Sequence, residues 1–197
     1  MLEQQKGIII PNKADRSKIL DYINKYSYYK YTCNERGEIK RDGNKKNGFF
    51  GFGKSKSYSA VLDLAINTPD RIFINIDYTI VEYHNGKKYE YKVDSEAGGG
   101  VTNFSLSPPD IYVTITGEES YYDILLENMQ LVRYSPEEIL LHELVGHAIP
   151  AKLKKTKGSA IKNENVVREE LNLEKRKDTD NDSVVSHNAT DYELFEN

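Results

Sequence analysis

The sequence has little cysteine, no tryptophan and no long apolar run. Among 197 residues there is one cysteine, Cys33, and no tryptophan. A single cysteine excludes an intramolecular disulfide. No apolar run approaches the roughly 18 residues that a membrane-spanning helix needs, so no membrane span is expected. The first residues, 1–13, also lack the apolar stretch of a secretory signal.

An excess of positive charge is missing as well. Lys and Arg number 27 against 31 Asp and Glu, which gives a formal net charge of −4. Apart from a basic run at 152–157, the Lys and Arg residues are scattered. Nucleic-acid-binding domains concentrate their positive charge on one surface. We therefore expect no nucleic-acid partner.

Periodicity divides the chain into four parts within one predicted domain, because this length is enough for a single core. The strand patterns precede most of the helical ones, an order that favours an α+β fold. The expected parts are a helix and hairpin at about 1–56, the main strands at 57–118, a helical zinc-binding part at 119–175 and a polar tail at 176–197.

Two segments of the strand region contain residue patterns that indicate a particular backbone geometry. Residues 71–94 predict two long strands joined at Asn85-Gly86, a pair typical of tight hairpin turns. The stretch "GGGVTNF", 98–104, predicts a strand that opens with three glycines. Glycine in a strand often marks the close approach of another backbone. A simple loop is the alternative interpretation of this glycine run.

The segment "LLHELVGHAIP", 140–150, lies on a predicted helix with a clear start. Ser135 suits the N-cap, Pro136 suits the first helical position, and Glu138 completes a capping box. We expect this helix to end at about Ile149, because Pro150 disfavours helical geometry at the residue before it.

His142, Glu143 and His147 lie inside this helix, one residue further apart than in the zinc motif H-E-x-x-H. Residues five apart on a regular helix point about 140° away from each other, so the two histidines would not face one metal ion. One wide turn, a π-bulge, would remove the mismatch. Gly146 is the position where such a distortion is tolerated.

The motif His142-Glu143-Leu144-Val145-Gly146-His147 resembles the H-E-x-x-G-H signature of the dipeptidyl-peptidase III family of zinc peptidases. The resemblance covers this helix and a later glutamate. It implies that His142 and His147 bind one Zn²⁺ ion and that Glu143 acts on the metal-bound water.

A catalytic zinc ion needs a third protein ligand, and Glu164 is the candidate. It lies in "GSAIKNENVVREE", 158–170, in the middle of a predicted apolar helix face, where a carboxylate is costly unless it is paired or bound to metal. Arg168, one turn later, is expected to orient a carboxylate of the site. The alternative is a surface ion pair between Arg168 and Glu164.

Together, "LLHELVGHAIP" and "GSAIKNENVVRE" also resemble the metallopeptidase domains at the C-terminal ends of RHS-type and other polymorphic bacterial toxins, which are related to type III effector zinc proteases. The "GGGVTNF" strand is similar too. The resemblance covers roughly the second half of the chain. It implies a toxin domain that is secreted or delivered to a target cell as part of a larger protein, with a cognate immunity protein as partner. Otherwise the protein would be cytoplasmic.

Two further sets of residues are candidates. His187, in "VVSHN", is a candidate catalytic donor to the developing oxyanion, with a surface histidine in a polar tail as the alternative. The strand of Gly99, Gly100, Val101 and Thr102 is a candidate substrate-binding edge that pairs with an extended peptide.

The sequence thus predicts a zinc endopeptidase with a zincin-like α+β fold. Its antiparallel or mixed sheet would come from the N-terminal half and pack on the active-site helix and on a second helix that carries the third ligand. Glu143 would be the general base. Two alternatives stay open: a non-catalytic binding or structural module at the tip of a larger protein, and a zinc hydrolase of a non-peptide amide.

Overall fold

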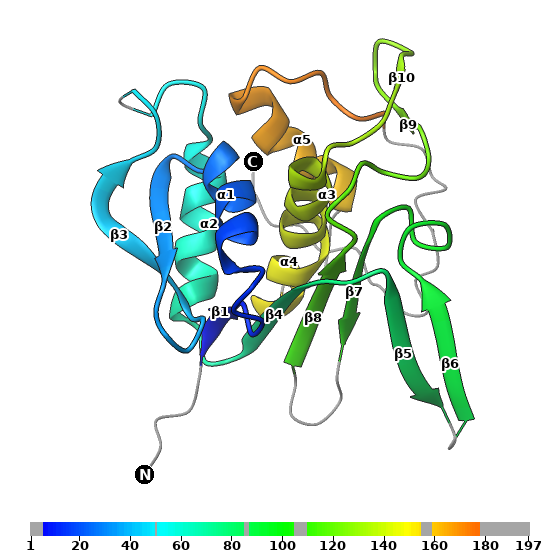
Figure 1. The fold of residues 1–197 in the computed structure, drawn as a ribbon. Coiled ribbons are helices and arrows are strands. Elements are labelled where there is room, and N and C mark those ends of the chain that lie inside the picture. Colours follow the sequence, from blue (N-terminus) through cyan, green and yellow to red (C-terminus); the bar gives the residue numbers. More distant parts are fainter. Residues whose placement is uncertain (1–5, 50, 85–86, 105–109, 155–158, 178–197) are drawn as a thin grey trace.

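The computed structural model describes residues 6–49, 51–84, 87–104, 110–154 and 159–177. Its centre is a four-stranded sheet with the strand order β1-β4-β8-β7 (Figure 1). The first three of these strands are parallel, and β7 pairs with β8 in the antiparallel direction. The strands are β1 (Gly7–Ile9), β4 (Arg71–Ile76), β8 (Asp110–Ile115) and β7 (Gly100–Phe104).

One face of this sheet packs against the hydrophobic core. Ile72 and Ile74 of β4 and Val113 of β8 are completely buried on it. On the opposite face the rings of Phe73 and Tyr112 stack, with centroids 5.2 Å apart. The alternation of strand side chains thus separates the core face from a partly solvated face.

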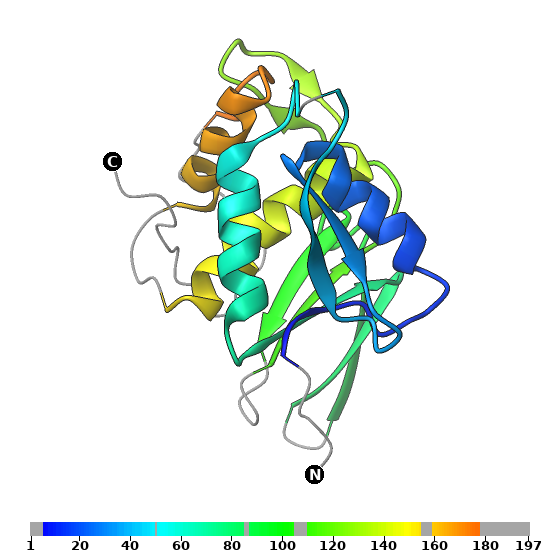
Figure 2. The same cartoon turned by 90° about the vertical axis from the view of Figure 1, so that its left-hand side faces the viewer.

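The helices that complete the core come from both halves of the chain. Figure 2 shows α3, η1 and α4 following one another as one continuous helical rod that passes behind α2. Where β7 and β8 meet the rod, they contact η1. The helical segments are α1 (Arg16–Tyr26), α2 (Lys56–Asn67), α3 (Pro136–His142), the π-helix η1 (Glu143–Ala148), α4 (Ile149–Lys152) and α5 (Ala160–Glu170).

Two hairpins flank the central sheet. The expected N-terminal hairpin is confirmed as β2 (Tyr29–Cys33) and β3 (Ile39–Lys46). The first long strand expected after Arg71 is wrong, because it is divided into β4 and β5 (Thr79–His84). Around the break, the Asp77 N–H donates to the Ile115 carbonyl and the Asp77 side chain accepts from the Thr79 N–H. The second half pairs with β6 (Lys87–Lys92) instead. The predicted turn at 85–86 lies outside the described residues.

The helical part of the chain begins later than expected, and the helix that carries the histidine motif ends later than expected. A short hairpin of β9 (Ile124–Leu125) and β10 (Leu131–Val132) precedes it, so the expectation of mostly helix from Tyr121 was wrong. The helical rod continues past Pro150 to Lys152. Pro150 lies just after the wide turn η1, near the start of α4.

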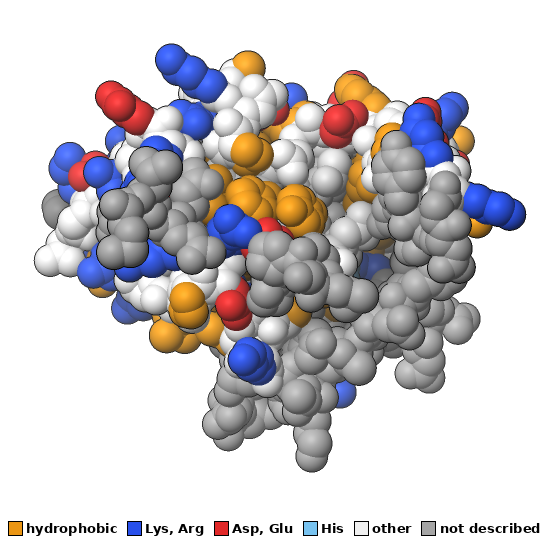
Figure 3. Space-filling model, turned by 90° about the horizontal axis from the view of Figure 1, so that it is seen from below, with side chains coloured by type: hydrophobic (Ala, Val, Ile, Leu, Met, Phe, Trp, Pro, Cys, Tyr) orange, Lys and Arg blue, Asp and Glu red, His pale blue; other side chains and the backbone are white. Residues whose placement is uncertain are grey.

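The strands and helices make an α+β fold, as predicted. Across the described ranges, no helix has both the length and the apolar character to cross a membrane. On the face seen from below, a patch of hydrophobic side chains lies next to both basic and acidic side chains (Figure 3). This mixture agrees with the scattered charges of the sequence.

Candidate metal centre

The wide turn predicted for the histidine motif is confirmed. Both halves of the capping box fix the start of α3: the Ser135 hydroxyl accepts from the Glu138 N–H, and the Glu138 carboxylate accepts from the Ser135 N–H. After His142 the helix widens into η1, Glu143–Ala148. The Ile149 N–H then donates to the Leu144 carbonyl, five residues back, which is the hydrogen bond of a π-helix.

Gly146 lies where η1 packs against the start of α5. A Cβ atom built on Gly146 would lie 3.0 Å from the Cβ of Ala160 and 3.4 Å from its Cα. The first of these distances is shorter than an ordinary carbon contact. The glycine therefore lets α5 pack directly against the wide turn, and this packing brings the two motif-bearing helices together.

The extra residue in the wide turn brings the side chains of His142 and His147 together, with one ring edge-on to the other. Their Nε2 atoms are 3.3 Å apart, and their ring centroids are 5.0 Å apart with the planes at 84°. On a regular helix the two side chains would diverge. Two nitrogens at 2.0–2.1 Å from one tetrahedral zinc ion are about 3.3 Å apart, so this separation fits a shared ion. It also fits a hydrogen bond between the two rings.

Glu164 contacts the other nitrogen of the His142 ring. Its Oε2 is 2.9 Å from Nδ1 of His142, which assigns the proton to Nδ1 and leaves the Nε2 lone pair facing His147. Burial lowers the pKa of His142, but the hydrogen bond to Glu164 together with the negative charges of Glu164 and Glu143 outweighs it, and the pKa is raised. Burial raises the pKa of Glu164, but His142 and the nearby arginines outweigh it and the pKa is lowered.

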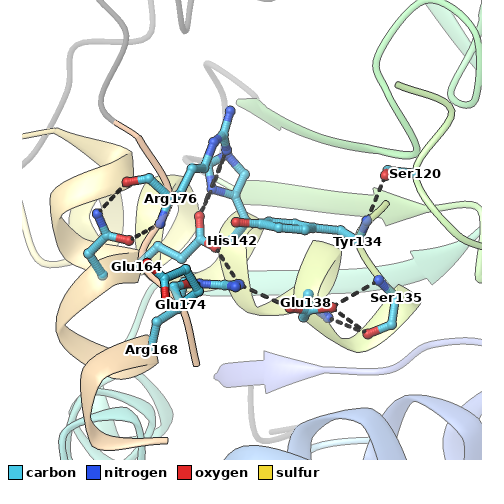
Figure 4. A network of polar contacts seen from close by, with 10 residues as sticks. Ser120, Tyr134, Ser135, Glu138, His142, Glu164, Arg168, Glu174 and Arg176 are labelled. Atoms are coloured by element: carbon cyan, nitrogen blue, oxygen red, sulfur yellow. Dashed lines mark hydrogen bonds and ion pairs between the residues drawn. The ribbon is translucent and has the colours of Figure 1, made fainter. Parts of the chain in front are cut away.

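Arg168 completes the surroundings of Glu164 (Figure 4). Its Nη1 is 3.4 Å from Oε1 of Glu164 and 3.0 Å from Oε1 of Glu138, and its Nε donates to the Glu174 carbonyl at 2.6 Å. Arg168 is 3% exposed and Glu164 is completely buried. The alternative of a surface ion pair is therefore wrong, and the guanidinium orients two carboxylates beneath the histidines.

Arg176 is a residue of the site that sequence reasoning missed. Its Nη1 lies 3.4 Å from Nδ1 of His142 and 3.8 Å from Oε2 of Glu164. The Asn165 side chain holds its backbone through two hydrogen bonds of 2.8 Å, one to the N–H and one to the carbonyl. The sequence placed Arg176 at the start of a polar tail, and no local pattern there indicates that the chain folds back over α5.

Tyr134 is the second residue that the sequence did not indicate. It is 2% exposed, and its hydroxyl makes no hydrogen bond with any described residue. Figure 4 shows the hydroxyl end of its ring directed toward His142 and Glu164. Burial and the charge of Glu164 raise its pKa, so the hydroxyl keeps its proton. A buried, unpaired hydroxyl at this point is a polar group that faces the candidate centre.

Glu143, the first residue of η1, contacts the edge strand β7. Its Oε2 accepts a hydrogen bond of 2.6 Å from the Thr102 hydroxyl. A Cβ on Gly100 would lie 2.5 Å from a methyl carbon of Ile139 and 3.2 Å from Oε1 of Glu143. A close contact therefore exists at Gly100, but side chains of the helical rod make it, whereas the glycine run predicted the approach of another backbone.

The predicted substrate-binding residues lie at the start of the edge strand β7. Gly99 has a φ of +112° and precedes β7, and Val101 pairs with Thr114 of β8. In the part of the sheet that the structure describes, the other edge of β7 pairs with no strand.

His187 lies outside the described residues. Among the described residues, no third His, Cys, Asp or Glu side chain joins the two Nε2 atoms in a group that would hold a metal ion.

A cavity of about 390 Å³ lies on the other, partly solvated face of the sheet. It is separate from the histidine pair, because Asn103 and Tyr112 point away from the helices that carry the motif. Its lining consists of Asn75, Asp77, Thr79, Ile80, Val81, Asn103, Phe104, Tyr112 and Thr114.

Comparisons with family models, with curated proteins and with solved structures find no match to this chain. Three features of the site bear on its function. They are the neighbouring imidazoles of His142 and His147, the buried carboxylate of Glu164 next to His142, and Glu143 at the edge strand β7.

Proposed function

We propose that this protein is a zinc-dependent peptidase in which His142 and His147 hold one Zn²⁺ ion. The observation that supports the proposal best is the separation of 3.3 Å between their Nε2 atoms, produced by a wide helical turn. π-helical turns are rare and are frequently found at functional sites. A zincin-like arrangement of the α+β fold is part of the same proposal.

Zinc, when bound, polarises a scissile carbonyl and lowers the pKa of a coordinated water. The protein supplies the proton transfer. Glu143 accepts the proton of the attacking water and passes it to the leaving amine as general base and then general acid. The Thr102 hydroxyl donates to Oε2 of this carboxylate and fixes its position next to β7.

Glu164 has a defined place in this proposal. Its role as the third zinc ligand stays a prediction, because its Oε2 now contacts Nδ1 of His142, on the side of the ring away from Nε2. A carboxylate at Nδ1 fixes the tautomer and the ring orientation of a metal-binding histidine. Ligation by Glu164 would require rotation of one of the two side chains.

The free edge of β7 suits an extended peptide as substrate. A peptide that adds to this edge as a strand satisfies the unpaired backbone groups of β7. It would then run beside the face from which Thr102 and Gly100 contact Glu143. This juxtaposition favours a peptide over a small amide, because a small amide would leave the strand edge unused.

The proposed setting is a toxin or effector domain that cleaves a protein of a target cell. It rests on the resemblance of the two motif-bearing segments to polymorphic-toxin metallopeptidases. Expression of the wild type in a cell without the matching immunity protein should impair growth, and the substitution Glu143→Gln should remove the effect. Equal growth of both strains at equal expression would contradict this setting.

The decisive experiment on catalysis compares wild type, Glu143→Gln and Glu119→Gln on a mixture of unfolded proteins and on small amides. We expect Glu143→Gln to lose cleavage while it keeps its zinc, because only the proton acceptor is removed. Glu119 is exposed and serves as the control that should keep full activity. Full cleavage by Glu143→Gln would refute its role as the base. Cleavage of amides alone would indicate a non-peptide hydrolase, and cleavage of neither would favour a binding module.

A further inference from the structure

The loop between β3 and α2 exposes aromatic side chains. This aromatic loop, 47–54, reads "NGFFGFGK". Phe49 is 80% exposed and Phe52 is 86% exposed, more than any other large hydrophobic side chain in the described part of the chain. Loop tips ordinarily carry small and polar residues. Two phenylalanines in contact with water therefore require an explanation.

The base of the aromatic loop is fixed by hydrogen bonds. The Asn47 side chain donates to the Ser27 carbonyl at 2.9 Å and to the Tyr29 carbonyl at 2.9 Å. On the other side, the Ser55 N–H donates to the Tyr26 carbonyl at 2.7 Å. A loop held at both ends in this way presents its tip in one direction.

The tip itself is shaped by Gly51. This residue has a φ of +77°, and a Cβ built on it would lie 2.3 Å from the ring of Tyr28. Both facts require glycine at this position. The Phe52 N–H donates to the Phe49 carbonyl at 3.2 Å, which closes a turn between the two exposed rings. The described part of the loop is therefore folded with the rings of Phe49 and Phe52 exposed to solvent.

Lysines surround the base of the aromatic loop. The Nζ atoms of Lys46 and Lys56 lie 5.1 and 5.5 Å from the centroid of the Tyr28 ring. Lys54 lies at the end of the loop, and its Nζ donates to the backbone carbonyl of Lys25. Lys45 is also present and pairs with Asp42.

Two acidic side chains lie near this base. Asp42 pairs with Lys45, and the Glu170 carboxylate accepts hydrogen bonds from the Ser55 hydroxyl and the Ser57 N–H at the start of α2. Lys45, Lys46, Lys54 and Lys56 outnumber these two carboxylates. The loop base therefore has an excess of positive charge, although the whole chain has a net charge of −4.

We propose that the aromatic loop is a docking site for the surface of an anionic lipid membrane. Exposed phenylalanines on a loop fit the boundary between headgroups and acyl chains, while the neighbouring lysines contact anionic headgroups. A protein partner would need a pocket deep enough for both rings. The combination of two highly exposed rings with neighbouring lysines favours the lipid surface.

The test is cosedimentation with vesicles of phosphatidylcholine alone and with about 30% phosphatidylserine. Wild type should sediment with the anionic vesicles and not with phosphatidylcholine alone. Phe49→Ser with Phe52→Ser should weaken binding by about tenfold or more for each ring. Lys46→Gln with Lys56→Gln should weaken it by about fivefold for each lysine. The control, Met129→Ser with Leu131→Ser on the exposed β9–β10 hairpin, should bind as wild type does.

A fluorescence measurement reports insertion directly. Because the chain contains no tryptophan, Phe52→Trp introduces a single tryptophan at the tip, whose emission is excited selectively over that of the tyrosines. Its emission should shift to shorter wavelength when anionic vesicles are added, and that of Leu131→Trp should not. Both measurements are repeated with Glu143→Gln and with a chelator, where binding should persist, so the result is independent of zinc chemistry. Wild type that stays unbound, or a Phe49→Ser, Phe52→Ser variant that binds equally well, would overturn the proposal and point to a protein partner.

Discussion

The helices α2 and α5 begin in the same way but bury different side chains. Ser55 caps α2 and Ser159 caps α5, each by accepting a hydrogen bond from the N–H three residues later. The helices have 12 and 11 residues and contact each other. The buried face of α2 consists of Tyr58, Ser59, Val61, Leu62 and Ala65, whereas that of α5 consists of Ala160, Ile161, Asn163, Glu164, Val167 and Arg168.

This difference shows that α5 is not optimised for stability alone. A buried ion pair rarely stabilises a fold more than apolar side chains of the same volume would, because both charges lose their hydration. Glu164 and Arg168 would therefore be unexpected on a helix whose task is only to fill the core, as α2 does. Their position behind His142 gives them a purpose in the candidate centre.

The largest effect is expected from Glu164→Ala. Removal of this carboxylate leaves Arg168 with Glu138 as its remaining acidic partner and leaves His142 without its acceptor. Breaking a buried pair on one side costs about 3 kcal/mol or more, because the remaining charge stays buried. Urea unfolding at pH 7 measures this loss.

The matched variant replaces both charges, Glu164→Met with Arg168→Leu. It should recover most of the lost stability, because an apolar pair resembles the buried face of α2. It should still lose the function of the centre. A stability of Glu164→Ala within about 1 kcal/mol of wild type would show that the buried pair is not the costly feature described here.

A smaller effect is expected from Gly146→Val. The added side chain meets Ala160, whose Cβ is already 3.0 Å from the place of the first added carbon. It would force η1 and α5 apart and cost about 1–3 kcal/mol. Thermal unfolding tests this, with Leu64→Val on the exposed face of α2 as the control that should change stability by about 0.5 kcal/mol or less. No difference between the two variants would contradict the tight packing of η1 on α5.

The smallest effect is expected from Glu170→Gln, which changes the contact between α5 and the start of α2. Burial raises the pKa of Glu170, but hydrogen bonds from Ser57 and Ser55 outweigh it and the pKa is lowered. Because the pKa is lowered, the carboxylate stabilises the fold at pH values above the pKa of the group in the unfolded chain, about 4.3. This contribution is lost as the pH falls through the pKa of the folded state. The group is largely solvated, so the variant should lose at most about 1 kcal/mol at pH 7.

The pH dependence provides the check on this last prediction. Unfolding curves of wild type and Glu170→Gln should converge as the pH falls below about 4, because the wild-type carboxyl is then protonated. A difference that persists at low pH would show that the contact does not depend on the charge.

Local features of the fold were predictable from the sequence. The capping box at Ser135 and Glu138 depends on residues within one turn, and it is confirmed. The wide turn also followed from a local conflict, since two histidines at this spacing cannot meet on a regular helix. Gly146 marked its place.

Features that depend on distant contacts were not predictable. β1 has three residues and pairs with β4 across more than sixty positions of sequence, which no local pattern reports. Arg176 reaches His142 only because Asn165 holds its backbone. Tyr134 precedes the helix cap and gave no signal of its own. Glu164 was correctly placed on a buried face, but its contact with Nδ1 rather than Nε2 depends on ring orientation, which the sequence does not encode locally.

The most direct test of the account is the metal content of protein purified without chelators, determined by elemental analysis for wild type and for His147→Ala. Circular dichroism verifies that both remain folded. The account predicts about one zinc ion per wild-type chain and loss of that ion in His147→Ala. Wild-type protein that binds no zinc after incubation with it would contradict the central claim, and the contact between the two rings would then be a hydrogen bond.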